Sequence, residues 1–293
     1  MNWLKHIKIY FILSGVLLVI SITSLFLWRL KLGIDFTGGA LIEYKFSKEM
    51  DDTNIYDIFE EAGAENISFE LSNDYKYLVK TNSLSTETKN QIDSELKNED
   101  ENYIELKYEL VGPSIGPELV QKTIYAIILS AFVILLWVAY QFKNLRYGLS
   151  AVLAMFHDSI ILLGSFSLLG HFWNVEIDFL FVTAMLTILS FSVHDTIVVF
   201  DRIREVTKKT HSEIPVIADL AITQTMVRSL NNSFTIIFML TALILFGGEA
   251  IKWFAAALLI GTILGTYSSP FVAVPLLVTF DKIKTFKLKS KNI

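Results

Sequence analysis

The segment FSVHDTIVVFDRIRE, residues 191–205, combines an apolar run with two adjacent titratable residues, His194 and Asp195. A charged cluster, from Asp201 to Glu205, follows it directly. A charge inside a membrane costs about 2.5–3.5 kcal/mol on insertion scales, and it persists where it faces a protein interior and finds a partner. The segment therefore raises two questions: whether it spans a membrane, and what its polar residues do there.

The composition favours a membrane protein. Of the 293 residues, 53% are hydrophobic and only 19% are charged, and the mean hydropathy is +0.49. Soluble domains are usually about 45–50% apolar and about 25% charged. The sequence has no cysteine, which excludes disulfides, thiolate metal sites and cysteine nucleophiles. It also has no ATP-binding loop, metal-ligand set or catalytic triad, so we expect no enzyme, no cofactor and no metal.

Six runs are long enough to span a bilayer, which takes about 20 mostly apolar residues. The first resembles a signal sequence, but its apolar core is too long and no small-residue cleavage site follows, so we expect a retained anchor. The last contains Pro270 and Pro275, which predict a kink or an early end. The predicted spans are Ile9–Trp28, Thr123–Tyr140, Leu149–Leu169, Phe179–Phe200, Ser233–Phe246 with some residues before it, and Trp253–Phe280.

Lysine and arginine residues predict the orientation, because they concentrate in cytoplasmic loops. On one side, short segments carry Lys5 and Lys8, then Lys143 and Arg146, then four basic residues between 202 and 209, and finally a lysine-rich tail. The opposite short loops, 170–178 and 247–252, hold a single lysine between them. We therefore expect both termini in the cytoplasm, with residues 1–30 as the first span, 119–280 as the other five and 281–293 as a basic tail.

Residues 31–118 form a predicted extracytoplasmic domain between the first and second spans. This insert carries 20 acidic residues and 8 lysines, a net charge of −12, whereas the rest of the chain carries +7. Its patterns predict the order β-α-β-β-α-β, which is the ferredoxin-like arrangement. We thus expect a polytopic α-helical membrane protein with six transmembrane helices and one inserted α+β domain. The predicted elements are Leu41–Phe46, a helix Thr53–Ala62 capped by Asp51 or Asp52, strands Asn66–Leu71 and Tyr75–Thr81, a helix Ser85–Asn98 capped by Ser85, and strand Tyr103–Val111.

Glycine and proline mark both ends of this insert. The segment GIDFTGG, residues 33–39, places a Gly-Gly turn before the first strand. At the other end, Gly112, Pro113, Gly116 and Pro117 predict an irregular hinge into the second span.

Two spans carry nearly the same motif, FHDSIILL at 156–163 and VHDTIVVF at 193–200. Each places a His-Asp pair in apolar sequence, His157 with Asp158 and His194 with Asp195. Counted from the outer helix ends at 1.5 Å per residue, Asp195 lies about 25 Å deep and Arg228 about 27 Å. At similar depth in a low-dielectric medium, these two are expected to form an ion pair. Asp158, at about 18 Å, lies nearer the middle of the bilayer.

Other polar residues extend this centre into a predicted polar track. Thr183, Thr187, Ser190 and His194 recur along one helical stripe, and Thr196 and Gln224 add to it. Two interpretations remain open at this point, a proton or ion path and a polar network that only holds the helices together. Arg228 has the alternative of snorkelling to the inner interface, and the histidines that of neutral hydrogen bonding.

The chain resembles the SecF family, whose members pair with SecD in a protein-export factor of the resistance-nodulation-division superfamily. The matching segments cover nearly the whole chain in order. They are GIDFTGG at 33–39, VGPSIG at 111–116, FHDSIILLG at 156–164, SVHDTIVVFDRIRE at 192–205, QTMVRS at 224–229, and GGEAIKWFAAALLIGTILGTYSSPFVAVPLL at 247–277.

This resemblance implies a subunit of the SecD–SecF accessory complex of the Sec translocon, which uses the proton motive force to promote protein export across the bacterial inner membrane. The implied partners are SecD, the SecYEG channel, the exported polypeptide, YajC and YidC, with no nucleic acid. Asp195 and Arg228 match the family's buried acidic and basic positions, and His157-Asp158 matches its third-span motif. His194 departs from the family's usual asparagine and adds a group that titrates near neutral pH. The outer-loop signature of the family corresponds to Asp35, Phe36, Thr37, Gly38 and Gly39.

Two other functions remain open. The first is a small-molecule proton antiporter of the same superfamily, although such pumps usually have twelve spans and two large outer domains. The second is a passive scaffold that stabilises the translocon. The scaffold predicts that a neutral pair of similar size can replace Asp195 and Arg228 without loss.

Overall fold

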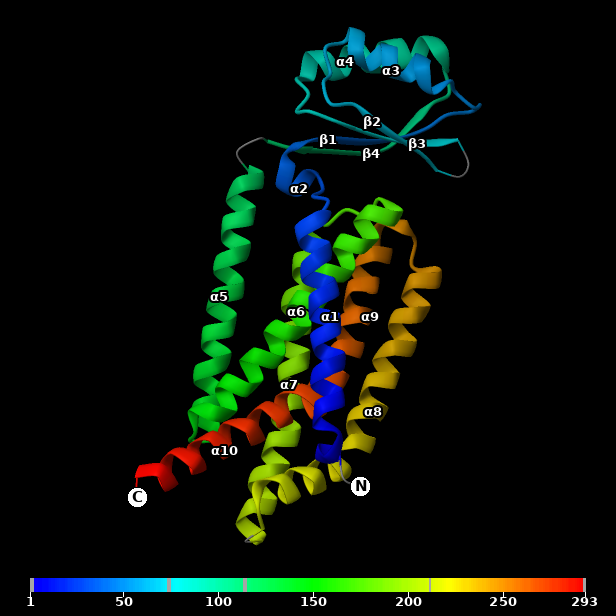
Figure 1. The fold of residues 1–293 in the computed structure, drawn as a ribbon. Coiled ribbons are helices and arrows are strands. Elements are labelled where there is room, and N and C mark those ends of the chain that lie inside the picture. The colour runs from blue at the N-terminus through cyan, green and yellow to red at the C-terminus, as the bar shows by residue number, and fades with distance from the viewer. Residues whose placement is uncertain (1–2, 73–74, 113–114, 211, 292–293) are drawn as a thin grey trace. The chain divides into compact units, whose positions relative to one another are not determined.

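The computed structural model describes residues 3–72, 75–112, 115–210 and 212–291 (Figure 1). The chain forms two compact units, one of residues 1–31 with 125–293 and one of residues 32–124. The first unit is helical, and the second contains a four-stranded sheet. The second unit begins at residue 32, where the predicted insert begins at 31. It ends at residue 124, six residues after the predicted end at 118.

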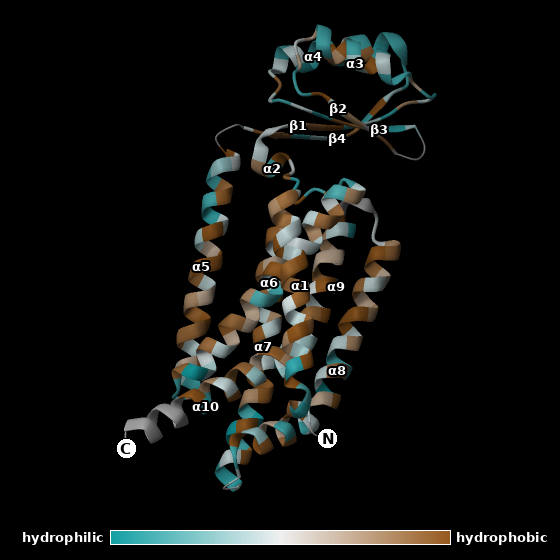
Figure 2. Cartoon of the chain, viewed as in Figure 1, coloured by the Kyte–Doolittle hydropathy of each residue, from teal (hydrophilic) through white to brown (hydrophobic). Residues whose placement is uncertain are grey.

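All six predicted spans are helices that are long and apolar enough to cross a membrane, which confirms this part of the prediction. Figure 2 shows the apolar residues running along these helices. Most helices extend beyond the predicted apolar runs, because polar caps and charged turns continue them. In chain order they are η1 (Trp3–His6) with α1 (Ile7–Leu27), α5 (Ile115–Gln141), α6 (Leu145–Trp173), α7 (Phe179–Lys209), α8 (Ile214–Phe246), and α9 (Glu249–Ser268) leading into α10 (Val274–Lys291).

Helices α6, α7 and α9 form the centre of the helical unit. More than half of each helix's apolar segment is buried, whereas α1, α5 and α8 leave most of theirs exposed. The core between them is made of aliphatic and aromatic side chains such as Met155, Leu189, Phe200 and Val274. The large exposed apolar surfaces of α1, α5 and α8 are those expected of helices that face lipid or another membrane protein.

Two glycines let α9 pack closely on α7. A Cβ atom added at Gly261 would lie 2.3 Å from the side chain of Ile188, and one at Gly265 would lie 3.2 Å from the Cα atom of Ser192. Small residues at such crossings allow backbones to approach in membrane proteins. This close crossing brings the polar end of α9, Ser268, to the middle of the bundle.

The predicted kink at Pro270 takes the form of a π-helical turn, η2 (Ser269–Ala273). Pro270 has no N–H and cannot make the regular helical bond, so the chain widens by one residue there. The early end does not occur, because the helix resumes as α10. Pro275 lies at the start of α10, directly after this widened turn.

The second unit has the element order β-α-β-β-α-β after a short helix. Its sheet has the order β2-β3-β1-β4, and every neighbouring pair is antiparallel. Helices α3 and α4 cover one face of the sheet, where Ile42, Tyr44 and Val79 pack against Phe59 and Ile92 (Figure 1). The elements are α2 (Ile34–Thr37), β1 (Gly39–Lys45), α3 (Asp52–Glu61), β2 (Ser68–Ser72), β3 (Lys76–Thr81), α4 (Thr86–Glu99) and β4 (Ile104–Val111).

The predicted helix caps are present. Of the two candidates before α3, Asp51 is the cap, since its Oδ1 accepts a hydrogen bond from the backbone N–H of Thr53 at 3.1 Å. Ser85 Oγ accepts from the backbone N–H of Thr88 at 3.1 Å. Each cap satisfies an N–H that the helix itself leaves without a partner.

Asp100, after α4, is expected to make the second unit sensitive to acid. Its carboxylate accepts hydrogen bonds from the Ser47 backbone N–H at 2.6 Å, the Ser47 hydroxyl and the Asn102 N–H. The Ser47 N–H above all holds the pKa of Asp100 below its ordinary value. A lowered folded-state pKa stabilises the fold above the unfolded value of about 3.9 and loses this contribution as the pH falls through the folded value.

We therefore expect Asp100→Ala to lower the free energy of unfolding of this unit by about 1–3 kcal/mol at neutral pH. The difference from wild type should shrink as the pH approaches 3, which denaturant unfolding at several pH values measures. Asp57→Ala on the exposed face of α3 is the matched control and should be close to neutral. A difference for Asp100→Ala that does not depend on pH would contradict this account.

Candidate functional site

Asp195 is a carboxylate buried in the middle of a spanning helix. It lies on α7 with 4% of its surface exposed, and its Oδ2 accepts a hydrogen bond from Ser229 Oγ on α8 at 2.6 Å. Among the described residues, no cation lies within ion-pairing distance of this carboxylate. A hydroxyl group satisfies one oxygen but does not balance the charge, so the site is one where a proton can be bound and released.

The predicted ion pair between Asp195 and Arg228 is not formed. Successive residues of an α-helix point about 100° apart, and Ser229 takes the position that faces α7. Arg228 is exposed instead. Asp195 and Arg228 do lie at a similar level, as the residue count predicts, because Ser229, the residue after Arg228, bonds to Asp195. The residue count does not give the direction in which each side chain points.

Arg228 lines a polar pocket between α7 and α8. The pocket has a volume of about 470 Å³. Gln224, predicted as part of the polar track, also lies here, and its Oε1 accepts a hydrogen bond from Arg202 Nε at 2.6 Å. The lining residues are Val198, Asp201, Arg202, Glu205, Gln224, Thr225 and Arg228.

The predicted polar track divides into an exposed and a buried part. Thr187, Ser190 and His194 are exposed on α7, as is Thr183 before them. The same helical stripe continues through Val198 to Asp201, and both residues line the pocket beside Arg228. We call Thr183, Thr187, Ser190, His194, Gln224 and Arg228 the exposed polar face. The predicted stripe on α7 is therefore present, but it does not include Asp195, because His194 is exposed and Asp195 is buried on another side of α7.

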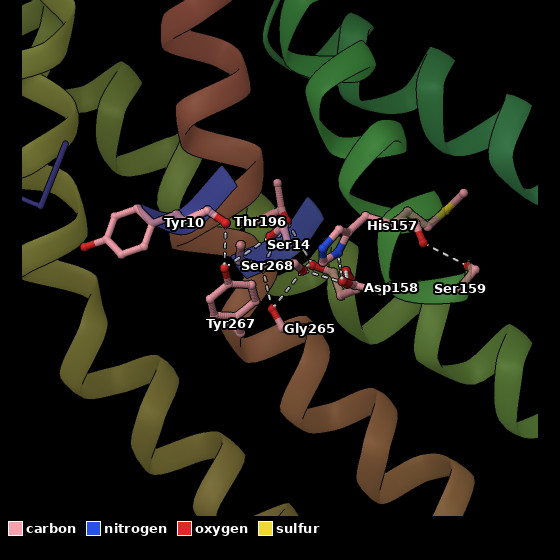
Figure 3. A network of polar contacts seen from close by, with 12 residues as sticks. Tyr10, Ser14, His157, Asp158, Ser159, Thr196, Gly265, Tyr267 and Ser268 are labelled. Atoms are coloured by element: carbon pink, nitrogen blue, oxygen red, sulfur yellow. Dashed lines mark hydrogen bonds and ion pairs between the residues drawn. The ribbon is translucent and has the colours of Figure 1, made fainter. Parts of the chain in front are cut away.

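The His157-Asp158 motif forms a separate buried cluster (Figure 3). Asp158, 1% exposed, accepts hydrogen bonds from Ser192 Oγ on α7 at 2.7 Å and from Ser268 Oγ on α9 at 2.6 Å. His157 Nδ1 lies 2.9 Å from Asp158 Oδ1. Ser192 and Ser268, which bond to Asp158, and Ser229, which bonds to Asp195, were not predicted as site residues. Their only signal in the sequence is that they are polar residues within apolar spans.

Thr196, the buried member of the predicted track, joins α7 to the π-helical turn. Its hydroxyl donates to the Ser192 carbonyl at 3.0 Å and lies 3.0 Å from Ser269 Oγ. Ser269 in turn donates to the carbonyl of Gly265 at 3.0 Å. These contacts hold the widened turn against the polar centre of the bundle.

The outer-loop signature forms the one-turn helix α2 and the start of β1. Asp35 is in the first turn, Phe36 is buried, and Thr37 Oγ1 donates to the Gly33 carbonyl at 3.2 Å. Gly38 ends the turn at φ 74° and Gly39 has φ 128°, both in the region that favours glycine. A Cβ at Gly39 would lie 2.4 Å from the carbonyl oxygen of Thr81. The two glycines of the signature thus allow the turn from α2 into β1 and the close approach of β1 to β3.

The predicted hinge is only partly irregular. Gly116 and Pro117 belong to the first turn of α5, while Gly112 precedes the helix and Pro113 is outside the described residues. A Cβ at Gly116 would lie 2.3 Å from the carbonyl oxygen of Phe36. Two segments that are about eighty residues apart in sequence, the outer-loop signature and the start of α5, are therefore in direct contact within the second unit.

Comparison with known proteins gives a consistent result. The family described as "Protein export membrane protein SecD/SecF, C-terminal" matches residues 91–283, and "SecD/SecF GG Motif" matches residues 29–50. The chain is 39% identical to a protein translocase subunit SecF of Thermobaculum terrenum over 93% of this chain and 91% of that protein. It is 32% identical to SecF of Helicobacter pylori over 100% of this chain and 92% of that one.

A solved structure has the same fold. It is that of SecDF, a translocon-associated membrane protein from Thermus thermophilus, with a TM-score of 0.84 and 30% identity. The match covers 96% of this chain and 39% of the SecDF chain, so this protein corresponds to less than half of that polypeptide.

Proposed function

This chain belongs to the SecD/SecF family of protein-export membrane proteins, and we propose that it is the SecF subunit of a SecD–SecF complex that uses the proton motive force to promote protein export. The proposed role is in transport and not in catalysis. SecD and the translocon are its proposed partners, together with the exported polypeptide, YajC and YidC.

The proposed use of protons rests on the environment of Asp195. A carboxylate within a spanning helix, held by one serine hydroxyl and by no described cation, is costly when charged and less costly when protonated. A change in its protonation therefore changes the balance between two packings of α7 and α8. This is the property that a proton-driven subunit needs.

The exposed polar face supports a partner within the membrane. Thr187, Ser190 and His194 lie on a helix that spans the bilayer, yet this chain leaves them uncovered. Exposure of such groups to lipid is unfavourable, and exposure of the Arg228 guanidinium is more so. We propose that SecD covers this face.

A photo-crosslinker attached at Thr187→Cys is therefore expected to form an adduct with SecD. The absence of cysteine from the chain makes a single-cysteine variant straightforward. Leu129→Cys is the matched control, because Leu129 is 63% exposed on the apolar surface of α5. Gel analysis of the purified complex should show a SecD adduct for Thr187→Cys and much less for Leu129→Cys. Equal labelling of SecD at both positions would contradict the proposed interface.

For the second unit we infer a ferredoxin-like domain on the extracytoplasmic side of the bacterial inner membrane. The strand order β2-β3-β1-β4 with both helices on one face supports the fold. The acidic composition of residues 31–118 supports this orientation. The basic residues Lys143 and Arg146 between α5 and α6, and those from Arg202 to Lys209 at the end of α7, support cytoplasmic termini.

A further inference from the structure

A polar cluster separate from Asp195 lies at the crossing of α6, α7 and α9. Its centre is Asp158, whose Oδ2 accepts from two hydroxyl groups, Ser192 Oγ and Ser268 Oγ, and whose Oδ1 faces His157 Nδ1. His157 and Asp158 are 6% and 1% exposed. Side chains from three helices thus converge on one carboxyl group in the interior of this chain (Figure 3).

The charge of this cluster requires a proton for neutrality. The two serines are neutral donors, and among the described residues no lysine or arginine pairs with Asp158. An ionised Asp158 beside a neutral His157 would leave one uncompensated negative charge, which costs several kcal/mol in a low-dielectric interior. One added proton, held by the carboxyl group or by the imidazole, removes this charge.

The second ring nitrogen of His157 also points to proton exchange. Nε2 is buried and has no hydrogen-bond partner in the described part of the chain. Buried polar atoms are normally paired, so an unpaired one at a titratable group needs a reason. The ring lies beside Tyr267, with 6.5 Å between ring centroids, and the Tyr267 hydroxyl contacts Ser14 Oγ at 3.1 Å and the Tyr10 carbonyl at 3.2 Å on α1. The Tyr267 side chain thus lies between the His157 ring and the polar groups of α1.

The cluster is also attached to the irregular part of the last span. Ser268 is the final residue of α9, and the π-helical turn Ser269–Ala273 follows it directly. Ser269 lies against Thr196 on α7. Such turns are frequent at functional sites. A change in the charge of Asp158 changes the strength of its bond to Ser268 and therefore the support of this turn.

We propose that His157 and Asp158, with Ser192 and Ser268, form a second proton-binding site whose occupancy sets the packing of the π-helical turn between α9 and α10. The use of this site in transport rests on the proposed function, but its proton binding does not. The titratable groups nearest to the cluster on the packed helices are Tyr10 of α1 and Tyr267 of α9, which contact each other. On α7, His194 is exposed and Asp195 bonds to Ser229 instead. Residues 274–280 of α10 are uncharged.

The test uses the full chain with SecD in lipid nanodiscs. Infrared spectra over a pH titration report protonated carboxyl groups, and amide hydrogen exchange, corrected for its intrinsic pH dependence, reports residues 262–278. We expect wild type to show a buried carboxyl signal that Asp158→Asn removes, together with pH-dependent exchange of this segment that Asp158→Asn abolishes. Asp201→Asn, which changes an exposed carboxyl group on α7, is the matched control and should retain both features.

Ser268→Ala provides a variant that keeps the carboxyl group. It should retain the infrared signal but lose the link between pH and exchange at the turn. Persistence of the pH-dependent exchange in both Asp158→Asn and Ser268→Ala would overturn the proposal. A response of the site to sodium at constant pH, with no response to pH, would also overturn it. The infrared and exchange measurements do not depend on protein export. A failure of this proposal can therefore be distinguished from a failure of the proposed function, which the export assay tests.

Discussion

Asp195→Asn is expected to abolish the gradient-dependent part of protein export while the complex with SecD still assembles. Asparagine has nearly the same shape and can still accept the hydrogen bond from Ser229, but it cannot bind and release a proton. A membrane potential of 100 mV supplies about 2.3 kcal/mol per charge moved across it. Loss of one coupled proton therefore removes a bias of at most about 50-fold, since 1.36 kcal/mol corresponds to a factor of ten.

The measurement is export of a secreted reporter into inverted vesicles with and without a proton gradient. Asp201→Asn is the matched control, because Asp201 lies on the same helix but is exposed and pairs with Arg204 at 2.7 Å. An exposed pair of this kind contributes about 0–1 kcal/mol, so export should hardly change. If Asp195→Asn remained responsive to the gradient, the carboxylate would be structural and the passive scaffold would be the better description. Arg228→Met tests the exposed polar face in the same assay.

Gly39→Ala is expected to destabilise the second unit far more than Gly63→Ala. Both glycines have positive φ, 128° and 84°, so each alanine costs about 1–2 kcal/mol of backbone strain. A Cβ at Gly63 meets nothing within 4 Å, whereas a Cβ at Gly39 would lie 2.4 Å from the Thr81 carbonyl oxygen in β3. Displacement of a paired strand adds about 1–3 kcal/mol. The total for Gly39→Ala is then about 2–5 kcal/mol.

Hydrogen exchange of β1 and β3 in the full-length chain measures this difference. Protection of both strands should fall in Gly39→Ala, with little change in the spanning helices. In Gly63→Ala the protection should fall less, because only the backbone strain of about 1–2 kcal/mol applies there. Equal losses for the two variants would show that the contact with Thr81 relaxes without cost.

The spans and the strands could be predicted from sequence because each depends on local patterns. Apolar runs of sufficient length specify the six helices, and alternation with side-chain caps specifies β1, α3 and the elements after them. The cap at Asp51 illustrates this, since it depends only on a side chain two residues before its donor. The short helix α2 was not predicted, because one turn of helix has no periodicity to read.

The polar contacts could not be predicted, because they depend on the rotation of each helix and not on depth alone. A difference of one residue replaces Arg228 by Ser229 as the partner of Asp195, and it places His194 on the surface beside a buried neighbour. The convergence of Ser192 and Ser268 on Asp158 requires the close crossing at Gly265, which follows from the packing of whole helices. The one-dimensional count of residues carries no information on this packing.

The pairing of β1 with β4 has a consequence for how such a protein can change over evolutionary time. Gly39 and Val111 are register partners on adjacent antiparallel strands, so the chain enters and leaves the sheet about 4.5–5.5 Å apart. A module whose ends already meet adds little closure entropy to the connection between α1 and α5. The sheet-containing unit could thus be lengthened, or replaced by another fold with equally close ends, without a change in the architecture of the helical unit.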